Sequence, residues 1–88
     1  MKTIFEFIEF KQVPNPGKTT QKWLCRNRKS GTVLTEIKYE PGWRQYISDQ
    51  QEPGMIFSAG CQRDIAEFLE SLNKQHKEEC AARKAMGG

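Results

Sequence analysis

Basic and aromatic side chains recur in the middle of the chain at positions that could hold a phosphate-bearing ligand. Arginine and lysine bind phosphate oxygens through charge and hydrogen bonds, and tyrosine and tryptophan rings stack on nucleobases. The candidate ligand-binding residues of both kinds are Lys22, Arg26, Lys38, Trp43, Arg44 and Tyr46. This combination predicts a binding module for an anionic ligand, either a nucleotide or a nucleic acid, and no cofactor is expected.

The charge of the chain is concentrated in its first two thirds. The 88 residues carry a formal net charge of +3, and residues 1–57 hold nine basic residues against six acidic ones. Between positions 18 and 29 there are five basic residues and no acidic residue. A local field of this sign favours anionic partners, although an ordinary solubilising strand face would carry similar charge.

Other chemistries are poorly supported. The chain has three cysteines and one histidine without the spacing of a zinc site, so no metal is expected. His76 and Cys80 are one helical turn apart and could form a dyad, but an exposed helix offers no cleft or oxyanion donors. The sequence therefore disfavours an enzyme.

The cellular setting expected from the sequence is the host-cell cytosol. Unpaired cysteines suit a reducing compartment, and no segment has the length and apolar character of a membrane span. Glu6 and Glu9 interrupt the apolar N-terminal run, which argues against a signal peptide.

The elements that must position these residues form one α+β domain over residues 1–88. Turn residues at 13–17, 29–31 and 40–42 separate runs typical of strands at 3–12, 19–28, 32–39 and 43–48, with a short edge strand at 55–57. We expect residues 1–57 to form a twisted antiparallel sheet of four to five strands, packed by one long C-terminal α-helix over 58–86.

The helix is predicted by an apolar stripe. Ser58 is a suitable N-cap, and an apolar residue follows at each turn: Cys61, Ile65, Phe68, Leu69 and Leu72. Beyond Asn73 the stripe thins, so the helix should project past the sheet and be exposed or used by a partner.

Two hairpin registers decide which side chains share a face. A two-residue loop at 30–31 would place Trp23 opposite Lys38, whereas a three-residue loop at 29–31 places it opposite Ile37 and Cys25 opposite Thr35. The second keeps apolar groups together and uses Gly31 as the left-handed residue, so it is preferred. A three-residue loop at 40–42 would likewise place Tyr39 opposite Trp43.

These registers predict two different faces. The face toward the helix would carry Trp23, Cys25, Val33, Ile37, Tyr39, Trp43 and Ile47. The opposite face would carry Lys22, Leu24, Arg26, Leu34, Glu36, Lys38, Arg44 and Tyr46. That second face is predicted to bind phosphates and bases, or else to pack against the first strand or a second copy of the chain. We expect a homo-oligomer.

Part of the chain resembles a family of short, mostly uncharacterised phage and prophage proteins. The matching positions are Ile37, Lys38, residues 43–46 (WRQY), Phe57, Cys61, residues 63–66 (RDIA) and Phe68, within a similar region over about residues 22–73. Tyr39 and Glu40 depart from the Trp-Tyr of the family pattern. The resemblance implies a phage setting and brings no established activity.

The expected function is therefore non-enzymatic binding in a phage context. By analogy with small phage proteins, the ligand could be a host immune signalling nucleotide that the protein sequesters, which would be counter-defence. The alternative is a protein-binding inhibitor or adaptor that acts on a host protein. Phosphate binding should weaken steeply with salt, and an apolar protein interface should not.

Overall fold

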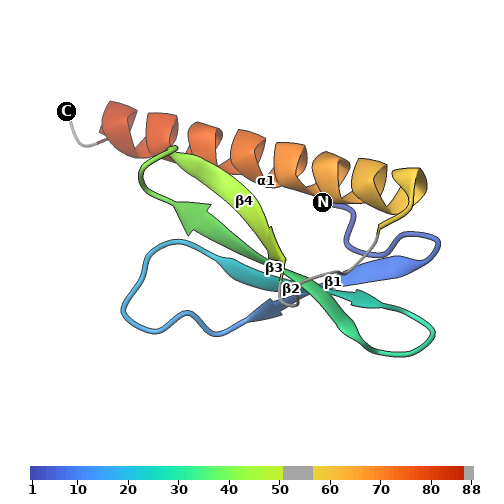
Figure 1. The fold of residues 1–88 in the computed structure, drawn as a ribbon. Coiled ribbons are helices and arrows are strands. Elements are labelled where there is room, and N and C mark those ends of the chain that lie inside the picture. The colour runs from blue at the N-terminus through green and yellow to red at the C-terminus, as the bar shows by residue number, and fades with distance from the viewer. Residues whose placement is uncertain (51–56, 87–88) are drawn as a thin grey trace.

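The protein folds into a four-stranded antiparallel sheet followed by one long helix. The computed structural model describes residues 1–50 and 57–86, and the backbone alone for 84–86. The strands β1 (Ile8–Val13), β2 (Lys22–Asn27), β3 (Val33–Glu40) and β4 (Gln45–Gln50) lie in sequence order, and α1 (Ala59–Met86) crosses one face (Figure 1). The α+β prediction is confirmed. Two residues of the expected edge strand, Met55 and Ile56, lie outside the described residues, and Phe57 is not in a strand.

The first strand begins later than predicted. Ile4 forms an isolated bridge with Glu9, and the Phe5 N–H donates to the Ile8 carbonyl at 2.9 Å, so residues 4–9 make a tight reversal. This reversal buries Phe5 and leaves Phe7 60% exposed. Strand pairing with β2 therefore begins only at Ile8.

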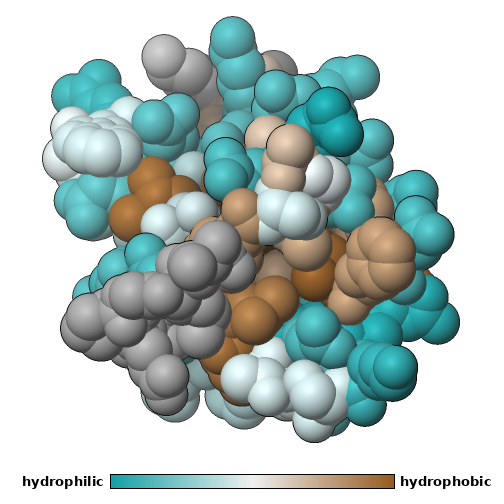
Figure 2. Space-filling model, turned by 45° about the vertical axis from the view of Figure 1, so that its right-hand side comes forward, coloured by the Kyte–Doolittle hydropathy of each residue, from teal (hydrophilic) through white to brown (hydrophobic). Residues whose placement is uncertain are grey.

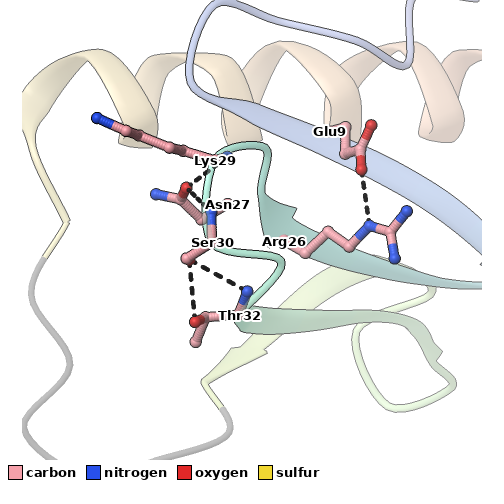
Figure 3. Close-up of polar contacts among 6 residues, drawn as sticks. All are labelled: Glu9, Arg26, Asn27, Lys29, Ser30 and Thr32. Atoms are coloured by element: carbon pink, nitrogen blue, oxygen red, sulfur yellow. Dashed lines mark hydrogen bonds and ion pairs between the residues drawn. The ribbon is translucent and has the colours of Figure 1, made fainter.

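The β2–β3 register agrees with the prediction at its centre. Trp23 lies opposite Ile37 and Cys25 opposite Thr35. The Asn27 side chain accepts the N–H groups of Lys29 and Ser30 at 2.8 and 3.1 Å (Figure 3), and Gly31 has the expected positive φ of 76°. Such a side-chain contact to the following backbone stabilises a turn.

A register shift at the end of this hairpin changes the assignment of Leu34. Between Cys25 and Arg26 the pairing slips by one residue, so that Arg26 lies opposite Val33. Leu34, predicted for the outer face, packs against the core instead. A bulge of this kind re-aims side chains beyond it, which sequence periodicity does not reveal.

The β3–β4 register differs from the prediction by three residues. Tyr39 lies opposite Tyr46, not Trp43, and Thr35 lies opposite Gln50, not Ile47. The turn uses residues 41–44, with the Trp43 N–H donating to the Glu40 carbonyl at 3.2 Å. An odd shift exchanges the two faces of a strand. Tyr46 therefore points to the helix and Ile47 to the opposite face, which reverses both assignments.

The helix packs on the sheet through the predicted stripe. Ile65, Phe68 and Leu72 are buried, while Cys61 and Leu69 pack partly buried against the same core. The Cys61 N–H donates to Ser58 Oγ at 3.2 Å, which confirms the N-cap. The described side chains from 77 to 83 are exposed, as expected for a helix that extends past the sheet (Figure 1).

Asn73 ties the middle of α1 to the edge strand. Its Oδ1 accepts the Tyr46 N–H at 2.6 Å, and its Nδ2 donates to the Tyr46 carbonyl at 3.4 Å. Backbone groups at a sheet edge otherwise need water or another strand. This side chain therefore fixes the start of β4, next to the β3–β4 turn, against the helix.

Candidate phosphate-binding site

The six predicted ligand-binding residues do not share one surface. We use "outer face" for the side of the sheet turned away from α1; Lys22, Arg26 and Lys38 lie there, because their neighbours Trp23, Cys25 and Ile37 are buried beneath the helix. Trp43 and Arg44 lie in the β3–β4 turn, and Tyr46 is in the core. The single basic and aromatic face predicted from the sequence is therefore wrong.

These three cations of the outer face are each paired with a carboxylate on a neighbouring strand. The nitrogen–oxygen distances are 3.4 Å for Lys22–Glu36, 2.7 Å for Arg26–Glu9 (Figure 3) and 3.0 Å for Lys38–Asp49. The hydrogen bond and the charge of Asp49 raise the pKa of Lys38. Partly exposed pairs like these contribute little to stability, so an incoming anion can replace the carboxylate as partner.

Tyr46 is unsuited to stacking on a base. Only 3% of it is exposed, and its ring lies against those of Tyr39 and His76 at centroid distances of 5.3 and 5.5 Å. Its hydroxyl accepts the Gln21 N–H at 2.9 Å, and burial raises the pKa of this hydroxyl. Trp43 is the opposite case, because 69% of it is exposed and its ring is open to a partner.

A basic depression lies between the β1–β2 loop and the end of β3. This loop pocket has a volume of about 560 Å³. It is lined by Asn15, Gly17, Lys18, Thr19, Thr20, Lys22, Glu36, Lys38, Tyr39 and Pro41. Three lysines thus surround a space that contains one carboxylate, and two threonine hydroxyls can add hydrogen bonds to an anion.

The β1–β2 loop is held in shape by its own hydrogen bonds. Asn15 Nδ2 donates to the Thr20 carbonyl at 3.0 Å, and the Lys18 N–H donates to the Asn15 carbonyl at 3.2 Å. Gly17 has a φ of 74°, a conformation that glycine adopts without strain. The loop brings Lys18 to the pocket, although Lys18 was absent from the predicted site. The signal that could have found it is the acid-free basic stretch that begins at Lys18.

A second basic depression lies between the β3–β4 turn and α1. This turn pocket has a volume of about 450 Å³ and is lined by Tyr39, Arg44, Gln45, Asn73, His76, Lys77 and Cys80. Its two cations, Arg44 and Lys77, have no carboxylate within 4 Å among the residues that the structure describes. Tyr39 lines both pockets.

Comparison with known proteins assigns no family to the chain. No protein-family model, curated protein or solved structure matches the chain. The resemblance to short phage proteins therefore stays a prediction.

Within the described ranges, no helix combines the length and apolar character needed to cross a bilayer. In the same ranges, no three His, Cys, Asp or Glu side chains gather in a metal-binding arrangement.

The His76–Cys80 pair exists in the structure, at the rim of the turn pocket. Cys80 Sγ lies 3.6 Å from His76 Nε2 and 3.8 Å from Arg83 Nη2, and Cys80 is exposed. The His76 ring also packs on Tyr39 at a centroid distance of 4.9 Å. The absence of catalysis expected from the sequence stays a prediction.

The three thiols should differ sharply in reactivity. Burial, followed by the charges of Cys61 and Asp64, raises the pKa of Cys25 from 9.0 to about 12. At pH 8 we expect iodoacetamide to label Cys80 and Cys61 in the folded protein and to leave Cys25 unlabelled, because the thiolate is the nucleophile. Peptide mass mapping measures the rates, with the urea-unfolded chain as control. If Cys25 were labelled as fast as Cys80, the result would contradict the buried position of Cys25 in the core.

Proposed function

We propose that the protein binds a nucleotide or another phosphate-bearing ligand in the loop pocket, without catalysing a reaction. The observation that carries this proposal is the gathering of Lys18, Lys22 and Lys38 around one depression that contains a single carboxylate, Glu36. Ammonium groups gathered around one depression attract a multiply charged anion more strongly than a singly charged one. The volume of about 560 Å³ lies in the range of small-molecule sites.

Binding would exchange one set of ion pairs for another. Lys22 and Lys38 lie close to Glu36 and Asp49, whereas Lys18 has no carboxylate within 4 Å among the described residues. A phosphate group could therefore bind Lys18 first without displacing a carboxylate. In the phage setting that the resemblance implies, the matching role is sequestration of a host signalling nucleotide, as counter-defence.

The proposal is tested by calorimetric titration with ATP. Lys18→Gln should weaken ATP binding by about 1.5–3 kcal/mol, the range for a hydrogen bond to a charged group. Lys29→Gln is the matched control, because it removes the same charge from the β2–β3 turn, which lies at the other end of the sheet (Figure 1). Binding should also weaken as salt rises. The proposal fails if ATP does not bind at millimolar concentration or if both substitutions act equally.

A host protein as partner is the second candidate, and exposed apolar side chains favour it. Trp43, Phe7, Met1 and Ile4 are between 55% and 69% exposed. Figure 2 is turned toward the end where α1 begins and shows apolar surface surrounded by hydrophilic side chains. Tryptophan is enriched among the residues that dominate binding energy at protein interfaces. Association that persists at high salt would favour this candidate over the phosphate ligand.

Self-association stays a prediction, and one of its supports is lost. The sequence placed Leu24, Leu34 and Tyr46 together on the outer face as a surface for a second copy. Tyr46 is in the core and Leu34 packs against the core, so Leu24 is the residue of the three that stays on the outer face.

A further inference from the structure

The two basic pockets are adjacent parts of one surface. The loop pocket and the turn pocket share Tyr39, and the turn pocket shares Gln45 and Asn73 with a groove between β4 and α1 that Trp43 also lines. The β1–β2 loop and the β3–β4 turn lie at the same end of the sheet (Figure 1). These three depressions follow one another around the β3–β4 turn.

The charge of the molecule is concentrated along this path. The two pockets are lined by five cations, Lys18, Lys22, Lys38, Arg44 and Lys77, and by one carboxylate, Glu36. With Glu70, which lines the third depression, the path carries a net formal charge of +3, equal to that of the whole chain, so the remainder of the molecule has no net charge. The cations lie in two groups on either side of Tyr39, which suits a ligand with phosphates at more than one place.

An exposed aromatic side chain lies at the end of the path. Trp43 is 69% exposed and lines the groove between β4 and α1, and Arg44, the next residue of the same turn, lines the turn pocket. Base stacking on an exposed aromatic ring requires an unpaired base, and the flanking phosphate then meets the neighbouring cation. A free mononucleotide in the loop pocket would leave Trp43, Arg44 and Lys77 unused.

We propose that the phosphate-bearing ligand is a single-stranded nucleic acid. Its backbone passes from Lys18 in the loop pocket across Tyr39 to Arg44 and Lys77, and one base stacks on Trp43. This inference rests on the proposed function, because it extends the same loop pocket to a longer ligand. A site of about 4–16 nucleotides is typical of single-strand binding by one OB-fold domain.

The test is a fluorescence titration with thymidine monophosphate and with oligothymidylates of increasing length, up to about eight nucleotides. Affinity should rise with length, and the longer ligands should quench tryptophan emission. Trp23 is buried, so the quenching reports Trp43 and should disappear in Trp43→Leu. Lys77→Gln should weaken binding of the longest ligand about tenfold and leave the monophosphate unaffected.

Lys74→Gln is the matched control for Lys77→Gln, because Lys74 is an exposed lysine one turn earlier on α1 that lines none of these depressions. Lys77→Gln should also lower the slope of log affinity against log salt by about 0.7, the value for one phosphate contact on a single strand. Lys74→Gln should change neither quantity.

The outcomes separate the two proposals. If the monophosphate binds and Lys18→Gln weakens it, but longer ligands bind no tighter, the single-strand inference is wrong and the phosphate-binding function stands. Equal effects of Lys77→Gln and Lys74→Gln, or quenching that survives Trp43→Leu, also overturn the inference. If neither the monophosphate nor the oligomers bind, the single-strand inference is wrong, and the titration with ATP then decides whether the phosphate-binding function stands.

Discussion

Replacing Phe68 with alanine is expected to lower the free energy of unfolding by about 3–5 kcal/mol. Phe68 is 1% exposed and stacks on the Phe10 ring at a centroid distance of 3.9 Å, with the Trp23 ring edge-on at 5.1 Å. Phe68 therefore packs α1 against both β1 and β2. Alanine would leave a cavity that two rigid aromatic rings cannot fill. In a domain of this size the loss is a large part of the total stability.

Urea unfolding followed by circular dichroism measures this loss. Phe7→Ala is the matched control, since it removes the same side chain from a position that is 60% exposed, and it should cost less than about 1 kcal/mol. A loss below about 1 kcal/mol for Phe68→Ala as well would show that the helix does not dock on the sheet through this stripe.

The second large effect is expected at Arg44, where substitutions should affect the stability of the fold and the affinity for the ligand differently. Arg44 has a φ of 54°, a left-handed conformation that costs a non-glycine residue about 1–2 kcal/mol. Arg44→Gly should therefore be more stable than Arg44→Ala by up to about 1 kcal/mol, because glycine adopts this conformation without a Cβ clash. Both variants should bind an oligothymidylate less tightly by about 1.5–3 kcal/mol, since both lose the guanidinium group.

Thermal unfolding and fluorescence titration of the two variants test this expectation. Residues in strained backbone conformations gather at functional sites, and the geometry at Arg44 is such an outlier. A large loss of stability in both variants with unchanged binding would make Arg44 a structural residue and would remove it from the site.

The helix and the class of fold were predictable from sequence because they depend on local patterns. Ile65, Phe68 and Leu72 recur at helical spacing after a capping serine, and this spacing alone decides which side of α1 meets the sheet. The β2–β3 turn was also predictable at its centre, since Gly31 accepts a positive φ that most residues avoid. These features need no knowledge of distant residues.

The candidate site was only partly predictable. Lys22, Lys38, Trp43 and Arg44 line the three depressions, and their residue types pointed to phosphate and base contacts. Arg26 lines none of these three, because its guanidinium group is held by Glu9 at 2.7 Å on the neighbouring strand. A charged side chain in a list of candidates does not show whether a carboxylate far away in the sequence will pair with it.

The tertiary structure alone decided the register of β4 and therefore the fate of Tyr46. Pro41 and Gly42 fit turns of three or four residues equally well, and nothing in the residue type of Arg44 signals a left-handed backbone. The longer turn moves the pairing by three residues, which buries Tyr46 beneath α1 and leaves Trp43 in solvent. Sequence determined which residues could bind a phosphate or a base, and packing against the helix determined which of them remain exposed to do so.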